Sequence, residues 1–112
     1  MGLISPAAAE QLTRTELTPA QATAAAELLL EALKNRQGDV MHDALAAPVQ
    51  TSVDVKSVQA RLDQRVAIDA ARVVSVTPGH NTTTIDAVVT TASGDEGVLM
   101  VLDEDGKLLA WK

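Results

Sequence analysis

The stretch VLMVLDEDGKLLAWK, residues 98–112, places an acidic segment between two apolar runs. An Asp-Gly pair between such runs is among the strongest short-range signals for a β-hairpin, because Gly readily takes a positive φ. We therefore predict a turn at Asp105 and Gly106, joining antiparallel strands at 97–103 and 107–112. The hairpin indicates that the segment before it also belongs to a sheet.

A calcium loop is the alternative interpretation of these acidic residues. An EF-hand loop needs oxygen ligands at positions 1, 3 and 5 and Gly at position 6. Counted from Asp103, Lys107 and Leu108 occupy the fifth and sixth positions, so the pattern does not fit. The chain has no Cys and only two His residues, and no ligand cluster with metal-site spacing occurs. We expect no metal and no cofactor.

Two more strands are predicted ahead of the hairpin, at 69–77 and 82–92. The segments Pro-Gly-His-Asn and Ser-Gly-Asp-Glu-Gly, both rich in turn-forming residues, follow these strands. Connections this short join antiparallel neighbours, because a parallel crossover needs a dozen residues or more. The second half of the chain is therefore predicted to be a four-stranded antiparallel meander.

A long helix is predicted from 19 to 37, where Ala and Leu, the best helix formers, predominate. Thr18 and Gln21 have capping-box spacing, and Pro19 suits the first helical position. Gly38 is expected to end the helix as its carboxyl-terminal cap. An apolar stripe at helical spacing should face the core; its members are Ala22, Ala26, Leu29 and Leu33, widened by Ala25, Leu28, Leu30 and Ala32.

Shorter elements are predicted between this helix and the sheet. Asp39 is expected to cap a second helix at 40–46, which Pro48 stops. Residues 49–53, Val-Gln-Thr-Ser-Val, are rich in β-branched residues typical of a strand. Asp54 is expected to cap a third helix, whose apolar face would carry Val55, Val58, Leu62 and Val66.

Three helices followed by a meander predict an α+β fold, with helices packed on one face of the sheet. Residues 1–17 are expected to be a flexible lead-in, and residues 18–112 a single α+β domain. This order, closing on LDEDGKLLAW at 102–111, resembles the nuclear transport factor 2-like superfamily. The similarity is greatest to small bacterial domains of unknown function that end on an Asp-x-Asp-Gly-Lys turn and a Trp-bearing strand. The resemblance implies a truncated cone, with a curved sheet wrapped around the helices, often a pocket, and often dimerisation through the outer sheet face.

The composition argues against several classes of partner. Nine Lys and Arg residues against fifteen Asp and Glu residues give a formal net charge of −6, and the chain has one Trp and no Phe or Tyr. Nucleic-acid binding needs a basic surface, and single-strand binding also needs aromatic platforms. No run approaches the roughly 20 apolar residues of a transmembrane helix. We expect neither nucleic-acid binding nor membrane insertion.

The compartment is only weakly indicated. Ala-Ala-Ala at 7–9, before Glu10, has the small-residue character of a signal-peptidase site, but no basic region or apolar stretch precedes it. A cytoplasmic location is favoured, with export as the alternative if these residues mark a clipped signal.

Both faces of the predicted sheet are apolar. A sheet with one buried face should be polar on the other, so the second face is expected to be covered, either by a partner or by the amino-terminal segment. We expect a homodimer through that outer face, with a protein partner or a small apolar ligand as alternatives. The expected binding residues are Met41, Leu45, Leu99, Val101, Leu109 and Trp111. One face is predicted to carry Val74, Val76, Ile85, Ala87, Val89, Val98, Met100 and Leu102, and the opposite face Val73, Val88, Leu99, Val101, Leu109 and Trp111.

A catalytic role is the weaker expectation. The resemblance implies that ketosteroid-isomerase-like members use a pocket Asp as base, with Tyr or a protonated Asp as donor. Asp69 and Asp86 lie in predicted strands and His42 in the second helix, but the chain has no Tyr to serve as the donor. We expect a non-catalytic binding or accessory domain, and keep a small isomerase- or dehydratase-like enzyme using Asp69 or Asp86, assisted by His42, as the alternative.

Overall fold

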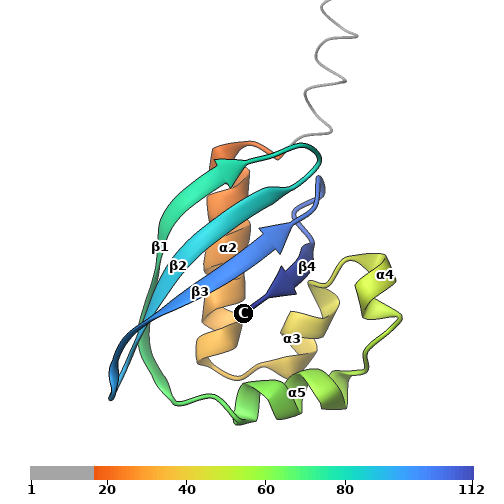
Figure 1. The fold of residues 1–112 in the computed structure, drawn as a ribbon. Helices are drawn as coiled ribbons and strands as arrows, with labels where there is room; N and C mark the ends of the chain where they lie inside the picture. The colour runs from red at the N-terminus through yellow and green to blue at the C-terminus, as the bar shows by residue number, and fades with distance from the viewer. Residues whose placement is uncertain (1–16) are drawn as a thin grey trace, which may run out of the picture.

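The computed structural model describes residues 17–112, in which the helices come first and a four-stranded sheet follows (Figure 1). The sheet has the order β1-β2-β3-β4, and every neighbouring pair is antiparallel. The predicted α+β meander is therefore confirmed. Except for Leu17, which is half-buried against the core, the expected lead-in lies outside the described residues. The elements are α2 (Pro19–Lys34), α3 (Gly38–Asp43), α4 (Ala47–Gln50), α5 (Val55–Asp63), β1 (Ile68–Pro78), β2 (Thr83–Thr91), β3 (Gly94–Leu102) and β4 (Leu108–Trp111).

The α2 helix begins with the predicted capping box. The Thr18 hydroxyl accepts a hydrogen bond from the Gln21 backbone amide at 3.1 Å, and Gln21 Oε1 accepts one from the Thr18 amide at 3.0 Å. The predicted stripe is buried, except that Ala25 is half-buried and Leu28 is 72% exposed. The helix ends at Lys34, three residues earlier than predicted, and Arg36 takes a positive φ of 54° in the link that follows.

Gly38 does not cap α2, so that prediction was wrong; it is the first residue of α3. Its lack of a side chain lets α3 approach α5, because a Cβ atom at this position would lie 2.9 Å from Gln59 Cβ. The Gly38 amide donates to Gln59 Oε1 at 2.9 Å, and Gln59 Nε2 donates to the Arg36 carbonyl at 2.9 Å. Close packing, and not a left-handed turn, requires glycine here.

The region between α3 and α5 also differs from prediction. Asp39 lies in the first turn of α3 and does not cap it. Pro48 does not stop a helix but lies in the first turn of α4, where its missing amide costs nothing. The segment 49–53 is not a strand, because Val49 belongs to α4 and turns follow.

The α5 helix confirms the third predicted helix and its cap. The Asp54 carboxylate accepts a hydrogen bond from the Ser57 amide at 2.8 Å. This bond holds the pKa of the Asp54 carboxyl below its ordinary value of 3.8. The helix ends at Asp63, before Val66. Of the predicted stripe, Val58 and Leu62 are buried, whereas Val55 and Val66 are exposed.

The β3–β4 hairpin forms as predicted. Gly106 has a φ of +79°, the positive value that the turn requires. The Asp103 carboxylate accepts hydrogen bonds from the amides of Asp105 and Lys107, at 2.9 and 2.8 Å. The acidic segment therefore closes a turn with its own backbone.

Two irregularities in strand register change the predicted sheet faces. Val73 pairs with Ala87 and Ser75 with Asp86, so Val74 is the extra residue of a bulge and is 57% exposed. Val73 points to the core instead, opposite to the prediction. A β-bulge shifts the alternation of all later side chains by one position.

The second irregularity lies in β4 and corrects the position of Trp111. Leu102 pairs with Leu108 and Val101 with Ala110, which leaves Leu109 as the extra residue. Trp111 then pairs with Met100 on the inner face, and it is 7% exposed. Its predicted place on the outer face was wrong.

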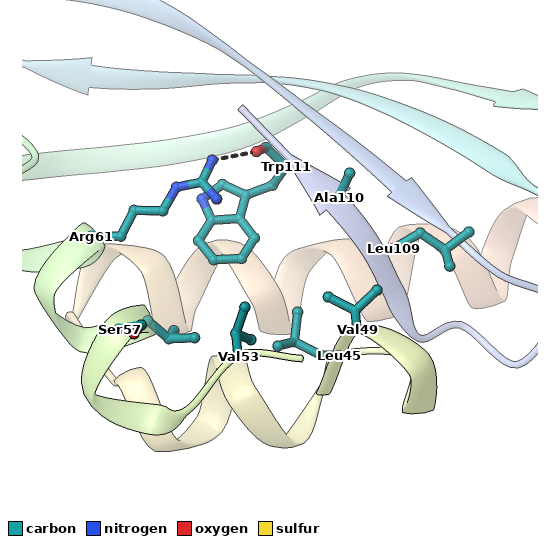
Figure 2. Close-up of a pocket in the computed structure, with 9 residues that line it drawn as sticks. Leu45, Val49, Val53, Ser57, Arg61, Leu109, Ala110 and Trp111 are labelled. Atoms are coloured by element: carbon teal, nitrogen blue, oxygen red, sulfur yellow. Dashed lines mark hydrogen bonds between the residues drawn. The ribbon is translucent and has the colours of Figure 1, made fainter. Parts of the chain in front are cut away.

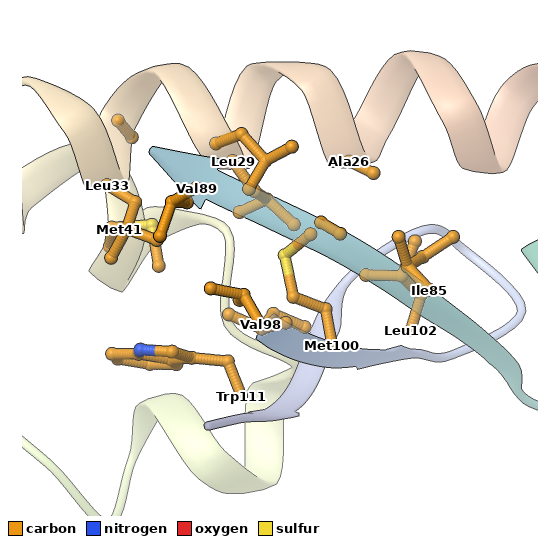
Figure 3. Packing of buried hydrophobic residues seen from close by; sticks show 14 of the residues in the cluster. Ala26, Leu29, Leu33, Met41, Ile85, Val89, Val98, Met100, Leu102 and Trp111 are labelled. Carbon is orange, nitrogen blue, oxygen red and sulfur yellow. The ribbon is translucent and has the colours of Figure 1, made fainter. Parts of the chain in front are cut away.

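The core lies between α2 and the inner face of the sheet (Figure 3). Leu29 and Leu33 of α2 face Val89, Met100 and their neighbours across this layer. Within residues 17–112 only α2 and α5 are substantial helices, and the sheet is not strongly curled, so the structure does not show the sheet wrapped around the helices that the resemblance implies for a truncated cone. Among residues 17–112, no helix combines the length and apolar character needed to cross a membrane.

Candidate ligand groove

An apolar groove lies at the edge of the sheet formed by β4, facing α4 and α5 (Figure 2). Its volume is about 300 Å³. We call it the β4 groove. Its lining residues are Leu45, Val49, Val53, Ser57, Val58, Arg61, Leu109, Ala110 and Trp111.

The β4 strand is only partly covered on its free edge. The Leu108 amide donates to the Ala44 carbonyl, and the Ala46 amide donates to the Leu108 carbonyl, both at 2.8 Å. This parallel bridge ties the start of β4 to the segment between α3 and α4. The bridge does not continue along β4. The edge of β4 beyond Leu108 therefore forms one side of the groove.

The backbone of Trp111 faces this free edge. Leu99 and Lys112 exchange backbone hydrogen bonds of 2.9 and 3.2 Å across the β3–β4 ladder. Along an antiparallel strand, residues whose backbone groups bond to one neighbouring strand alternate with residues whose backbone groups point to the other side. Because Lys112 bonds to β3, the backbone groups of Trp111 point away from β3. The Trp111 carbonyl accepts a hydrogen bond from Arg61 Nη2 at 2.6 Å.

Arg61 and Trp111 together form one end of the groove (Figure 2). The guanidinium carbon of Arg61 lies 4.0 Å from the centroid of the Trp111 ring, a cation–π arrangement. Trp111 Nε1 is buried, and no residue among those described accepts a hydrogen bond from it. Arg61 itself is exposed, so its side chain is the accessible part of this end.

The opposite wall of the groove comes from the irregular segment between α3 and α5. His42 Nε2 and the Val53 carbonyl oxygen lie 2.9 Å apart, and Gln50 Nε2 donates to the His42 carbonyl at 3.0 Å. These two contacts hold the turn after α4 in place. They present Val49 and Val53 toward β4 (Figure 2).

Of the described residues, Arg61 is the only charged one that lines the groove. Within residues 17–112, the one salt bridge joins Arg65 and Glu96, at 2.5 Å, so no described carboxylate neutralises Arg61. A positive charge that no described carboxylate pairs with thus lies beside an apolar surface, in a chain of net charge −6.

The structure separates the six predicted binding residues into three places. Leu45, Leu109 and Trp111 meet in the β4 groove. Met41 is buried in the hydrophobic core. Leu99 and Val101 lie half-buried on the outer sheet face, on the side opposite to the buried Met100.

The three candidate catalytic residues do not share a site. Asp86 is exposed on the sheet and accepts a hydrogen bond from the Ser75 hydroxyl at 3.0 Å. Asp69 is exposed on β1, and His42 supports the groove wall from α3. In the described part of the chain, no group of three or more His, Asp or Glu side chains is arranged to hold a metal ion.

Sequence reasoning did not assign six of the groove residues to a binding surface: Val49, Val53, Ser57, Val58, Arg61 and Ala110. Val49 and Val53 were interpreted as strand residues, and Arg61 lies outside the apolar face predicted for the third helix. The position of Arg61, directly before the buried Leu62, does not indicate that Arg61 contacts Trp111, which lies fifty residues later in the chain. Only the pairing of β4 with β3 brings them together.

The outer sheet face is the second surface of interest. Val88, Leu99 and Val101 are half-buried there. Figure 1 shows α2 behind the sheet and α3, α4 and α5 beside β4, so no described helix covers this face.

No protein-family model matches the chain, and no curated protein or solved structure matches it significantly.

Proposed function

We propose that this domain is a non-catalytic binding module and that the β4 groove holds a small apolar ligand. The observation that carries the proposal is the convergence of five apolar side chains from separate segments on an open groove. A volume of about 300 Å³ lies at the lower end of the range for small-molecule sites. The five are Leu45, Val49, Val53, Leu109 and Trp111.

The walls of the groove support binding because they are already in place. Leu45 and Trp111 belong to the buried core, and the contacts of His42 and Gln50 fix the turn that carries Val53. Few side chains and loops of such a site have to become ordered when a ligand binds, so the entropic cost of binding is small. The apolar area that it buries can then contribute to affinity.

Trp111 provides the readout for a direct test, since it is the only Trp in the chain. N-phenyl-1-naphthylamine, a neutral apolar fluorophore, accepts excitation energy from a nearby Trp. We expect saturable energy transfer from Trp111 in the wild-type protein, and binding weakened about 3- to 10-fold by Val53→Gln through lost apolar contact.

Val66→Gln is the matched control, because Val66 is also exposed but does not line the groove. It should bind the probe as the wild type does. Absence of saturable transfer in the wild type, or equal binding by both variants, would show that the groove is not a ligand site.

A second candidate function is self-association through the outer sheet face, supported by the uncovered apolar residues Val88, Leu99 and Val101. Val101→Lys should convert a dimer to a monomer, since it buries an unpaired charge at the interface. Light scattering over a dilution series measures the mass. Val66→Lys is the control, and an unchanged mass for a folded Val101→Lys variant would rule out this interface.

Membership of the nuclear transport factor 2-like superfamily remains part of the proposal. It is supported by the order of helices followed by a meander and by the Asp-Gly turn before the Trp-bearing strand. The weak curl of the sheet argues for a truncated form that does not close around an interior pocket.

A further inference from the structure

We propose that the ligand of the β4 groove is an aliphatic carboxylate, with its carboxylate at Arg61 and its hydrocarbon chain along the apolar walls. This inference rests on the proposed function and adds the chemical class of the ligand. It follows from three features of the groove: its isolated charge, its surplus of hydrogen-bond donors and its shape.

The charge of Arg61 is the first feature. A guanidinium stays protonated at every physiological pH, and a planar carboxylate can accept two parallel hydrogen bonds from it. No described carboxylate performs this role for Arg61. The remaining lining is neutral, so a neutral ligand would leave the one charge of the groove unused.

The surplus of donors at the same end is the second feature. Arg61 has five N–H donors, of which Nη2 is engaged by the Trp111 carbonyl. Trp111 Nε1, next to the guanidinium, is buried without a described acceptor, so the donors open to a ligand at this end are those of Arg61. Because an ionised carboxylate only accepts hydrogen bonds, it complements this end better than an amine, which also donates.

The shape of the groove is the third feature. Leu109 and Val49 lie at the end away from Arg61, with Leu45 and Val53 between them and the Trp111 ring (Figure 2). The polar contacts are therefore confined to one end. A ligand with one anionic group at the tip of an apolar chain fits this division, and the volume of about 300 Å³ favours a short chain.

The test compares octanoate with 1-octanol, which has the same chain length without the charge. The indole N–H resonance of Trp111 in a ¹H–¹⁵N spectrum reports binding of both, since the chain has no other indole. We expect octanoate to bind about 5- to 10-fold more tightly than octanol at low salt. Raising the salt to about 0.5 M should reduce that preference.

Arg61→Gln should bring the octanoate-to-octanol preference to about 1 while octanol affinity stays close to wild type. Arg72→Gln is the matched control, because Arg72 is exposed on β1 and does not line the β4 groove; it should retain the preference. The salt dependence of the wild type tests the same inference without any variant, should Arg61→Gln fail to fold.

The outcomes separate the two proposals. Equal binding of octanoate and octanol by the wild type would overturn the carboxylate inference and leave the apolar ligand site standing. A retained preference in folded Arg61→Gln would overturn the role of Arg61. Binding of neither compound, together with no binding of the naphthylamine probe, would overturn the proposed function itself. A tetrapeptide with an apolar carboxyl terminus that binds more tightly than octanoate would overturn the assignment to a free aliphatic acid.

Discussion

Two regions of the molecule differ in how completely side chains fill the space between their elements. One is the layer formed by α2 and the sheet, and the other is the region formed by α3, α4, α5 and β4. In the layer, a helix of 16 residues runs along the sheet and its apolar stripe fills the space with aliphatic side chains. In the other region the helices have 6, 4 and 9 residues, and the strand has 4. The layer has a packed core, whereas the other region has the β4 groove.

The difference shows where a small domain can form a binding surface. A long amphipathic helix covers a sheet continuously, because its apolar residues recur on one face over several turns. Short helices joined by turns cover an edge strand only at isolated points, such as the bridge between Leu45 and Leu108. The part of β4 beyond this bridge lies beside apolar side chains of the α3–α5 region, and the β4 groove lies between them.

The largest expected effect tests the filled layer. Ile85 is completely buried between α2 and the sheet, and Ile85→Ala should lower the free energy of unfolding by about 2–5 kcal/mol through lost burial and a cavity. Val74→Ala, at an exposed position of β1, should change it by less than about 0.5 kcal/mol. Chemical denaturation measures both, and similar values would contradict the described core.

The second prediction tests the packing that supports the groove. Gly38→Ala places a Cβ atom against Gln59 and should cost about 1–3 kcal/mol by pushing α3 from α5. Gly97→Ala is the control, since a Cβ there meets no atom within 4 Å. We also expect Gly38→Ala to weaken binding of the naphthylamine probe. Full stability and full binding together would show that the α3–α5 contact does not support the groove.

The third prediction concerns the turn before β4, on which the groove depends. Gly106→Val forces a β-branched residue into a φ of +79° and should cost about 1–2 kcal/mol. The nearest atoms to an added Cβ lie at ordinary contact distance, 3.5 Å for Leu17 Cδ1, so the cost arises from the backbone conformation. Thermal unfolding measures it, and an unchanged midpoint would mean that the turn does not need glycine.

The smallest expected effect is a pH dependence at the start of α5. Because the folded-state pKa of Asp54 is lowered, its contribution to stability is complete above the ordinary value of 3.8 and is lost as the pH falls through the folded-state value. Asp54→Asn retains a capping side chain without a titrating group. The wild type should therefore lose more stability than Asp54→Asn on acidification, measured by denaturation at neutral and acidic pH. Equal losses of stability in the wild type and in Asp54→Asn would show that the contribution of the cap does not depend on Asp54 ionisation.

Local signals in the sequence were sufficient for the elements of the layer. The capping box of Thr18 and Gln21, the stripe of α2 and the Asp-Gly turn act between residues close in the chain, and each appears in the structure. The four strands were predicted to within three residues at each end. The cap of α5 at Asp54 was predicted for the same reason.

The errors occur where distant contacts overrule local preference. Gly38 was interpreted as a cap, but Gln59 of α5 determines its role. Residues 49–53 have strand-like composition, yet Pro48 starts a short helix that includes Val49, and turns follow it. Val73, Val74 and Trp111 were assigned to the wrong faces because strict alternation does not include a bulge.

The candidate site was predictable only in part. Leu45, Leu109 and Trp111 were expected among the binding residues, but Leu99 and Val101 belong to another surface and Met41 to the core. The sequence by itself determined the α+β order, the turns and the apolar content of the core, because these depend on neighbours within a few residues. The tertiary structure decided the faces of β1 and β4, the meeting of Arg61 with Trp111 and the existence of the β4 groove. These depend on strand register and on helices packing across long separations, which no local pattern encodes.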